Sequence, residues 1–514
     1  MRRILLAASS LVLAMTPLAN AQNEDVSDKT QLALAAGYKA LFTCSATFMA
    51  DQSKAVIGAN ELDGIYESYR PLMNKVSEAN INERKRLVTS RYDGDMPPRI
   101  ASYRPGLGCS LLPIGAGPES ASWLPAYDGQ PPKMGPDTST ALGDNVVITD
   151  NVLALDRLGV PVSFAFDGAT YGEGTRTSAL VVVHKGQVIA ERYARGIDAD
   201  KPQRTWSVAK SLTSTIIGAA VQDGLIGLDN EAVISAFNKG GDPRRAITLR
   251  HLLNMSSGLE SGTSGSRTDR VYFGGAAAMD MIPSAILEAK PGSRFKYANN
   301  DTLIAMRSLR EVLDDDAKYR AYPYTALLNK IGASSTILET DWQGDFISSS
   351  QVWMTARDMA RIGQLYLQNG RWGNEQILPN GWVQFVTKPA PAQPTSGDFG
   401  YGGAFWLIGG VDGAPQDAYA GLGNRGQYLV IIPSRNLVIV RRGYDIAGLE
   451  RFNIAKLAGD VTAAIDSIEA TRRAAEAAAE LEAEAARADE ADATPAPQTN
   501  PRGRTLRERM SNGG

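Results

Sequence analysis

Two pairs of apolar runs, one near residue 180 and one near residue 430, predict β-hairpins. Residues 178–183 (SALVVV) are followed by the turn-forming residues 184–187 (HKGQ) and then by VIAERYA. Residues 427–432 (QYLVII) lead in the same way through 433–436 (PSRN) into LVIVRR. Such β-branched runs bounded by turn residues are typical of strands. The pattern between the hairpins is helical and rich in loops, which predicts an α+β fold with one antiparallel sheet flanked by helices.

The first 150 residues follow a different pattern. Helical spacing of apolar residues predicts a helix over 29–49 and a second helix over 61–76. Residues 86–91 and 99–103 predict a short pair of strands around a turn, and 115–148, rich in Gly, Pro, Ser and Asp, predict a connection. We therefore expect an N-terminal extension over 22–150 and a main domain over 151–465.

The two ends of the chain are not expected to belong to the fold. Residues 1–21 contain Arg2 and Arg3, an apolar run and the small-x-small sequence 19–21 (ANA), the order of a cleaved secretory signal. We expect a secreted or periplasmic protein with no transmembrane span in its mature form. Residues 466–514 form a charged tail, in which Ala and Glu favour a solvated helix over 460–488. The tail could bind a partner, but its composition favours the simpler interpretation of a solvated spacer.

Cys44 and Cys109 are the only cysteines, and both lie in the expected extension. In an exported chain, two thiols favour a single disulfide that closes a long loop. Two buried free thiols are the alternative. Two isolated cysteines are a poor basis for a metal site.

Charge and histidine content narrow the chemistry. The formal net charge of −3 offers no field that would attract nucleic acid, so we expect none as a partner. His184 and His251 are the only histidines, which makes a His-rich metal centre improbable, and we expect neither a metal nor a cofactor. His251 lies in an apolar helical run, where a structural role is expected, and His184 lies in a hairpin turn, where exposure is expected. A serine enzyme would therefore need a base other than histidine.

The sequence Ser-x-x-Lys occurs twice, at Ser207–Lys210 and at Ser293–Lys296. Residues i and i+3 share one face of a helix, so this spacing brings an ammonium group to a hydroxyl only in a helix. An apolar stripe follows Ser207 and predicts that it begins a buried helix, whereas Ser293 follows Pro291-Gly292 and predicts a turn. A helix-capping serine is the structural alternative for Ser207.

A third pattern, residues 421–426 (GLGNRG), matches the glycine spacing of dinucleotide-binding loops. That function needs a strand before the glycines and a helix after them. Here a strand follows, so we expect a loop that enters the edge of a sheet rather than a dinucleotide site.

Tyr297 and Asn299 complete an ordered set of motifs. The order is the Ser207 helix, then P-G-x-x-x-x-Y-x-N over 291–299, then a glycine-containing triplet before the strand at 427. This set resembles the serine β-lactamase and penicillin-binding protein superfamily, most closely the branch of class C enzymes, family VIII esterases and 6-aminohexanoate-dimer hydrolases. Residues 249–259 (LRHLLNMSSGL) and 355–363 (TARDMARIG) are similar to further family segments. The resemblance covers roughly residues 150–465 and implies a β-lactamase/transpeptidase-like fold with an all-helical insertion.

The triplet departs from the family pattern. Gly421–Gly423 (GLG) stands where the family has Lys-Thr-Gly or His-x-Gly, so the cation or imidazole is missing. The departure weakens the β-lactamase and D-Ala carboxypeptidase interpretation, since that side chain helps to bind the substrate carboxylate in those members. Glycine-containing triplets fit the esterase and amidase branches.

The resemblance also implies a role for each residue. Ser207 would be the nucleophile, and Lys210 and Tyr297 would accept its proton. Tyr297 would then protonate the leaving group and later activate the deacylating water. The backbone N–H groups of Ser207 and Asn424 would bind the oxyanion beside the Gly421–Gly423 triplet. Asn299 would orient Lys210 or hold the substrate carbonyl. For Tyr297 and Asn299 taken alone, a core tyrosine and a turn residue are the structural alternatives.

Two hypotheses of different class follow. The first is an exported serine hydrolase that cleaves an ester or amide of a small molecule through an acyl-enzyme. The second is a non-catalytic sensor or scaffold of the same fold, in which the extension or the tail binds a partner. The identity of the substrate is not readable from the sequence.

Overall fold

The computed structural model describes residues 28–127, 129, 152–231, 233–261 and 267–492. Its main sheet is antiparallel and has seven strands in the order β12-β13-β14-β15-β16-β5-β6. These strands are β5 (Thr177–His184), β6 (Gln187–Tyr193), β12 (Gly400–Tyr401), β13 (Trp406–Leu407), β14 (Tyr419–Gly423), β15 (Gln427–Ile432) and β16 (Leu437–Gly443). Both predicted hairpins are present, with His184 opposite Gln187 and Ile432 opposite Leu437. The α+β prediction is confirmed.

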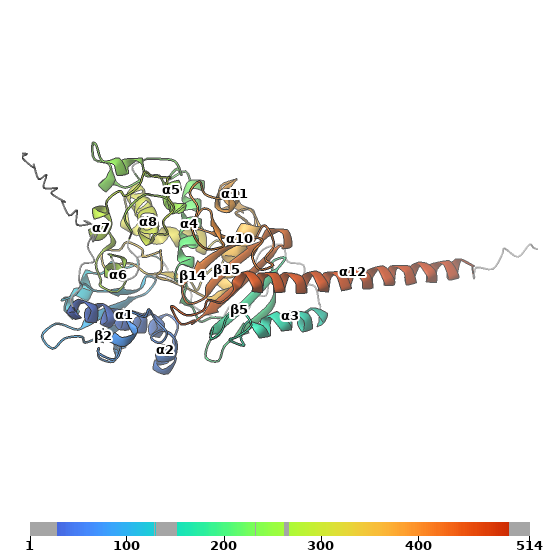
Figure 1. Ribbon diagram of the computed structural model, residues 1–514, viewed down its shortest axis with the longest axis horizontal. Helices are drawn as coiled ribbons and strands as arrows, with labels where there is room; N and C mark the ends of the chain where they lie inside the picture. Colours follow the sequence, from blue (N-terminus) through green and yellow to red (C-terminus); the bar gives the residue numbers. More distant parts are fainter. Residues whose placement is uncertain (1–27, 128, 130–151, 232, 262–266, 493–514) are drawn as a thin grey trace, which may run out of the picture.

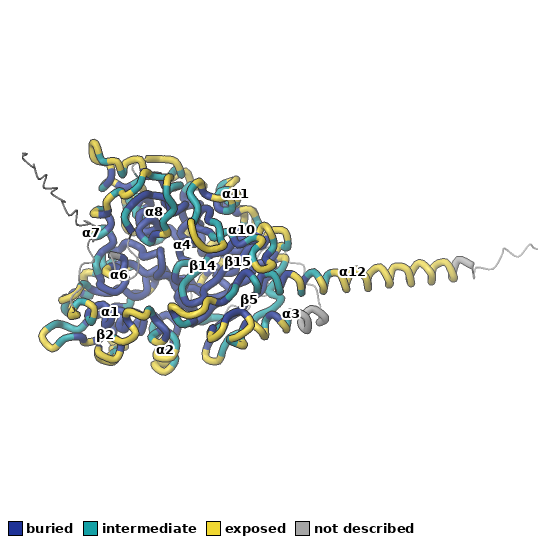
Figure 2. The backbone as a smooth tube through the Cα atoms, viewed as in Figure 1, coloured by how far each residue is buried: buried dark blue, intermediate teal, exposed yellow. Residues whose placement is uncertain are grey.

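Both faces of this sheet are covered, and every residue of the central strands β15 and β16 is buried (Figures 1 and 2). Successive side chains of a strand point to opposite faces. On one face, Val181, Val183 and Leu429 belong to the larger hydrophobic cluster, which also contains residues of α4 (Val208–Gln222) and α10 (Ala356–Leu367). On the other face, Leu180 and Val182 pack in a second cluster with α3 (Val152–Phe164) and α12 (Ile454–Asp492).

The segment between the two hairpins contains short helices joined by long loops, and its helices lie beside the α4 face of the sheet (Figure 1). Its further helices are α5 (Leu249–Leu253), α6 (Arg267–Tyr272), α7 (Ala278–Met281), α8 (Asn299–Leu313), α9 (Asp316–Tyr322) and α11 (Trp382–Thr387). Two small sheets interrupt it, formed by β7 (Gln203–Arg204), β8 (Ile337–Leu338) and β9 (Val352–Met354), and by β10 (Arg371–Trp372) and β11 (Glu375–Gln376). Helix α8 contacts both α4 and α5, and a hydrogen bond from Lys210 to Asn299 joins the first turns of α4 and α8.

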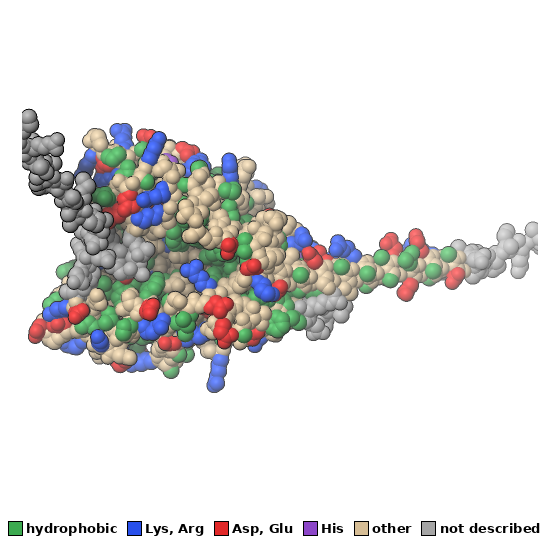
Figure 3. All heavy atoms as spheres, viewed as in Figure 1, with side chains coloured by type: hydrophobic (Ala, Val, Ile, Leu, Met, Phe, Trp, Pro, Cys, Tyr) green, Lys and Arg blue, Asp and Glu red, His purple; other side chains and the backbone are tan. Residues whose placement is uncertain are grey.

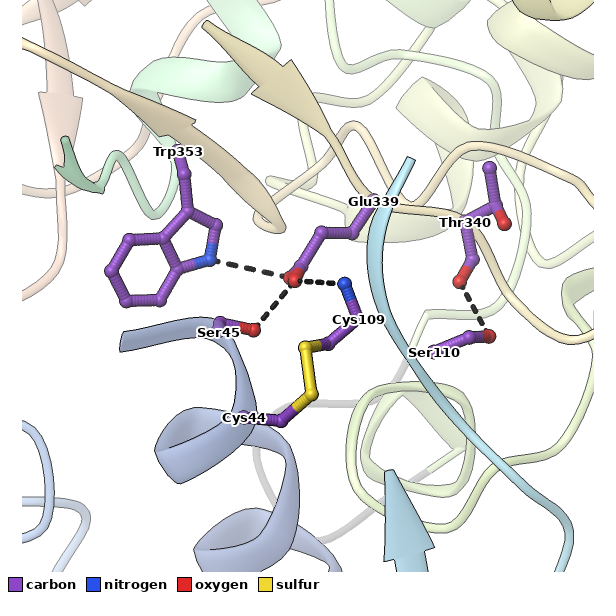
Figure 4. Close-up of a disulfide and its surroundings, with 7 residues drawn as sticks. All are labelled: Cys44, Ser45, Cys109, Ser110, Glu339, Thr340 and Trp353. Atoms are coloured by element: carbon purple, nitrogen blue, oxygen red, sulfur yellow. Dashed lines mark hydrogen bonds between the residues drawn. A yellow bond between two sulfur atoms is a disulfide. The ribbon is translucent and has the colours of Figure 1, made fainter. Parts of the chain in front are cut away.

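The N-terminal region is a helix packed on a four-stranded antiparallel sheet. Its elements are α1 (Asp28–Phe48), α2 (Lys54–Asn60), β1 (Asn80–Asn82), β2 (Leu87–Ser90), β3 (Arg99–Arg104) and β4 (Gly108–Leu111). The predicted disulfide is confirmed and joins Cys44 on α1 to Cys109 on β4, which lie 65 positions apart in sequence (Figure 4). Residues of α1 belong to the same hydrophobic cluster as α4 and α10, so this region shares the core of the main sheet.

The predicted helix over 61–76 is wrong. The chain there consists of turns and one short 3₁₀ segment, Arg70–Leu72, while the second helix is the earlier α2. Gly64 has a φ of +67°, which is incompatible with a right-handed helix. The buried carboxylate of Glu61 accepts a hydrogen bond from Tyr444 at 3.0 Å. Tertiary contacts therefore override the helical spacing of the apolar residues.

Helix α12 continues past the body of the protein (Figures 1 and 3). The tail was predicted as a solvated helix over 460–488. The helix is present, but Ile454, Leu457, Val461 and Ile465 are buried on the sheet, and the exposed part begins after them. Its exposed part carries charges of both signs among alanines (Figure 3).

In the described part of the chain, no helix has the length and apolar character needed to cross a membrane. The expected signal over 1–21 and most of the connection over 115–148 lie outside the described residues.

Candidate active site

Ser207 lies at the N-terminus of α4, as the apolar stripe predicts. Residues 202–206 and 208–220 are buried, and Ser207 is the one partly exposed position between them. The preceding Trp206 has a φ of +49°, an uncommon conformation for a bulky residue. This sharp turn from β7 into α4 presents the Ser207 hydroxyl to the surface of an otherwise buried helix start.

The ammonium nitrogen of Lys210 lies one helical turn further on and contacts three oxygen atoms. Nζ is 3.0 Å from Ser207 Oγ, 2.7 Å from Asn299 Oδ1 and 2.8 Å from the backbone oxygen of Ser349. Lys210 is 1% exposed, and burial lowers its pKa to about 7. A large fraction of Lys210 is therefore neutral near pH 7 and able to accept a proton.

These contacts also orient the nitrogen lone pair. A neutral amine has two N–H donors and one lone pair, and both the Asn299 amide oxygen and the Ser349 carbonyl oxygen can only accept. If the two N–H bonds point at these oxygens, the lone pair points at Ser207. The hydroxyl is then the donor in the 3.0 Å contact between Ser207 and Lys210. This is the geometry that a general base requires.

Tyr297 lies two residues before the start of α8 and faces the same serine. Its ring centre is 4.9 Å from Lys210 Nζ, and its hydroxyl hydrogen-bonds with the Ser207 hydroxyl. Although 36% of Tyr297 is exposed, desolvation by the surrounding protein atoms raises its pKa above the usual value, an effect that the hydrogen bond to Ser207 only partly offsets. The phenol is consequently protonated at neutral pH and can donate to Ser207, whose own proton is then directed to Lys210. Trp406 packs against the Tyr297 ring, with the two ring centres 5.5 Å apart.

The glycine triplet forms the end of β14, directly against the first turn of α4. A Cβ atom on Gly423 would lie 2.5 Å from the backbone oxygen of Thr205, and one on Gly421 would lie 2.9 Å from Ser211 Oγ. Glycine is therefore required by this close approach. Asn424 follows at the turn between β14 and β15, so the expected loop at a sheet edge is wrong: residues 421–426 are a hairpin inside the seven-stranded sheet.

The remaining candidates lie elsewhere. Ser293 is in a turn and bonds to the backbone of Lys290, so the second Ser-x-x-Lys match does not form a pair of this kind. His251 accepts from the Thr248 N–H at 3.2 Å and caps α5, the structural role expected for it. His184 ends β5 and is partly buried near Glu469, so the expected exposure is wrong because α12 covers it. Among the described residues, no group of His, Cys, Asp or Glu has the arrangement of a metal site.

Three further groups next to this site carry no recognisable sequence signal. One is the Ser349 carbonyl, since a backbone group leaves no mark on a sequence. Another is Tyr272 of α6, which bonds through its hydroxyl to the side chain of Ser349. The third is Tyr66, from the segment where a helix was expected, whose ring centre is 5.8 Å from that of Trp206. Only long-range contacts bring these residues together.

The antiparallel sheet, the buried Ser-x-x-Lys helix and the adjacent Tyr-x-Asn define the class: a protein of the serine β-lactamase and penicillin-binding protein superfamily. A family model described as Beta-lactamase matches residues 166–441, and the chain belongs to this family.

Similar proteins include hydrolases of different kinds. The 6-aminohexanoate-dimer hydrolase of Paenarthrobacter ureafaciens is 25% identical over 52% of this chain and 73% of its own length. The solved structure "Putative 6-aminohexanoate-dimer hydrolase from Bacillus anthracis" is 26% identical with a TM-score of 0.50, over 58% of this chain and 80% of that one. A family VIII carboxylesterase was also found, with 12% identity and a TM-score of 0.49 over 61% of this chain and 98% of that one.

Proposed function

We propose that this protein is an exported serine hydrolase that cleaves an ester or amide bond through an acyl-enzyme on Ser207. One observation carries the proposal: the buried Lys210 contacts Ser207 and two oxygens that can only accept hydrogen bonds. That arrangement leaves the lone pair of the neutral amine to the serine proton. A helix-capping serine would not need a buried lysine whose pKa lies near 7.

In the acylation step, Ser207 Oγ attacks the substrate carbonyl carbon while its proton passes to Lys210. The negative charge that develops on the carbonyl oxygen is bound by the backbone N–H groups of Ser207 and Asn424, aided by the N-terminus of α4. Tyr297 gives its proton to the departing oxygen or nitrogen and takes up the proton held by Lys210. The bond from the carbonyl carbon to the leaving group breaks, and an ester on Ser207 remains.

Deacylation repeats these roles with water. A water molecule attacks the ester carbonyl and gives a proton to the Lys210–Tyr297 pair, and the Ser207 oxygen departs and is reprotonated. The acid product leaves and the starting state is restored. Asn299 takes part as the acceptor that holds Lys210 in place, the first of the two roles expected for it.

The missing cation favours esters and neutral amides over β-lactams and D-Ala peptides. Gly421 has no side chain that could bind a substrate carboxylate. Its position against Ser211 leaves no room for a side chain at this residue. Export is supported by the Cys44–Cys109 disulfide, because such bonds persist in oxidising compartments.

A fluorophosphonate probe followed by peptide mass spectrometry tests the proposal. The adduct is expected on Ser207, to be absent in Ser207→Ala, and to persist in Ser293→Ala, which alters the other Ser-x-x-Lys match. A folded wild-type protein without an adduct on Ser207 would overturn the proposal and favour the non-catalytic alternative. Rates with a short-chain nitrophenyl ester, the linear 6-aminohexanoate dimer and a chromogenic cephalosporin then rank the bond types.

A further inference from the structure

The segment Glu61–Tyr69 of the N-terminal region lies against the turn that follows the glycine triplet. The guanidinium of Arg425, in that turn, donates to the backbone oxygen of Asp63 at 2.6 Å. The N–H of Ala447 donates to the backbone oxygen of Gly64 at 2.8 Å. The N-terminal segment is therefore attached to the turn that carries Asn424, whose N–H group would bind the oxyanion.

The conformation of this segment is closely fixed. Gly64 has a φ of +67°, and a Cβ atom there would lie 2.6 Å from the guanidinium of Arg176. Arg176 in turn forms an ion pair with the Asp63 side chain at 3.0 Å. Gly64 therefore combines a left-handed backbone conformation with a position that has no space for a side chain. This conformation sets the direction of the chain just before Tyr66.

This direction brings Tyr66 to the Ser207 site. Its ring meets Trp206, the residue before the serine, edge to face with centres 5.8 Å apart. Its hydroxyl lies beside the side-chain amide of Asn424, and it is close enough to Tyr297 for charge on one phenol to raise the pKa of the other. The nitrogen of the Asn424 amide is buried and meets no acceptor with good hydrogen-bond geometry among the described residues. Tyr66 itself is only partly buried.

We propose that Tyr66 is a substrate-binding residue of this site and donates a hydrogen bond to a polar acyl group. The inference rests on the proposed function. Tyr297 packs against Trp406, whereas Tyr66 packs against Trp206 and lies beside Asn424, next to the two N–H groups that would bind the oxyanion. An acceptor atom within one or two bonds of the scissile carbonyl would meet the Tyr66 hydroxyl there. Burial raises the pKa of Tyr66 to about 12, so it remains a donor at neutral pH.

A matched pair of esters tests this proposal. Nitrophenyl butyrate and nitrophenyl methoxyacetate have acyl chains of equal length, and only the second has an oxygen acceptor in the chain. We expect Tyr66→Phe to lower kcat/KM about tenfold for the methoxyacetate and less than about twofold for the butyrate, mainly through KM. Each variant is compared with wild type on the same ester, so the difference in intrinsic reactivity cancels. Tyr103→Phe, which removes another partly buried phenol of the same region, should change neither rate.

The result separates this inference from the proposed function. Equal kcat/KM ratios for the two esters, in a Tyr66→Phe protein whose Ser207 is still labelled by fluorophosphonate, would overturn the role of Tyr66 alone. No labelling of Ser207 in the wild type would overturn the proposed function. A purely structural role of Tyr66 would instead lower the melting temperature and reduce both rates by the same factor.

Discussion

The Nζ atom of Lys210 donates to the side-chain oxygen of Asn299 over 2.7 Å, although 89 positions separate the two residues in the sequence. The contact joins the first turn of α4 to the first turn of α8. It fixes one of the two N–H bonds of a neutral lysine and so helps to direct its lone pair at Ser207. In the proposed mechanism, the charge state of Lys210 determines when Ser207 can react.

The first prediction concerns the pH dependence of hydrolysis. Lys210 must be neutral to accept the serine proton, and burial lowers its pKa to about 7. We therefore expect kcat/KM to be low in acid, to rise through about pH 7 and to level off above it. The measurement is kcat/KM for a nitrophenyl ester from about pH 5 to about pH 9. Lys296→Ala should show the same profile, since that exposed lysine pairs with Glu288. A profile that is flat through this range would contradict Lys210 as the base.

The second prediction changes the partner of Lys210. Asn299→Asp replaces a neutral acceptor by a carboxylate of the same shape, which favours the ammonium form and raises the pKa of Lys210. The acidic limb of the pH profile should move up by about one to three pH units. Asn299→Ala removes the acceptor without adding charge and should not produce this upward shift. If both variants shift the acidic limb by the same amount, the charge on residue 299 does not control the pKa of Lys210.

Local contacts explain which parts of this site are predictable. Ser207 and Lys210 are three residues apart on one helix, so their 3.0 Å contact follows from spacing alone. The hairpins β5–β6 and β15–β16 are equally local. The Ser349 carbonyl lies 139 positions from Lys210 and belongs to the backbone, so the residue type at position 349 does not predict this contact. Tyr66 lies in a segment whose apolar spacing suggests a helix, and Gly64 and the bond between Glu61 and Tyr444 decide otherwise.

The third prediction separates acid catalysis from nucleophile activation. Tyr297→Phe removes the proposed proton donor to the leaving group and leaves Lys210 and Ser207 in place. An alkoxide needs that proton and a nitrophenolate does not. We expect kcat for an alkyl ester to fall by about 10² to 10⁴, with a much smaller loss for the nitrophenyl ester. Fluorophosphonate labelling of Ser207 should persist. Equal losses with both esters would assign Tyr297 to another step.

The fourth prediction concerns the disulfide. Cys44 and Cys109 are 65 positions apart, so the bond limits a long loop of the unfolded chain. Replacing both by alanine should lower the free energy of unfolding by about 2 to 4 kcal/mol. Chemical denaturation monitored by tryptophan fluorescence measures the change, and Cys44→Ala alone should give a similar loss because it also opens the bond. An unchanged denaturation midpoint in both variants would show that core packing alone holds α1 to β4.

The last prediction concerns Glu339, which joins the N-terminal region to the main domain (Figure 4). Its carboxyl group accepts hydrogen bonds from Ser45 at 2.5 Å, from the Cys109 N–H at 2.9 Å and from Trp353 at 3.3 Å. Burial outweighs these bonds and raises its pKa from 4.5 to about 7.

Between these two values the folded state retains a proton that the unfolded state has lost, so the contribution of Glu339 to stability falls as the pH rises from 4.5 to about 7. Over that window the loss amounts to at most about 3 kcal/mol. Glu339→Gln does not titrate, and any change in its hydrogen bonds shifts its stability by the same amount at every pH. Other carboxyls titrate equally in both proteins. The free energy of unfolding of the variant, relative to wild type, should therefore increase from about pH 4.5 to about pH 7 and stay constant above it. Parallel curves for the two proteins in denaturant titrations at several pH values would show that Glu339 is ionised throughout, held by the bonds from Ser45 and Cys109.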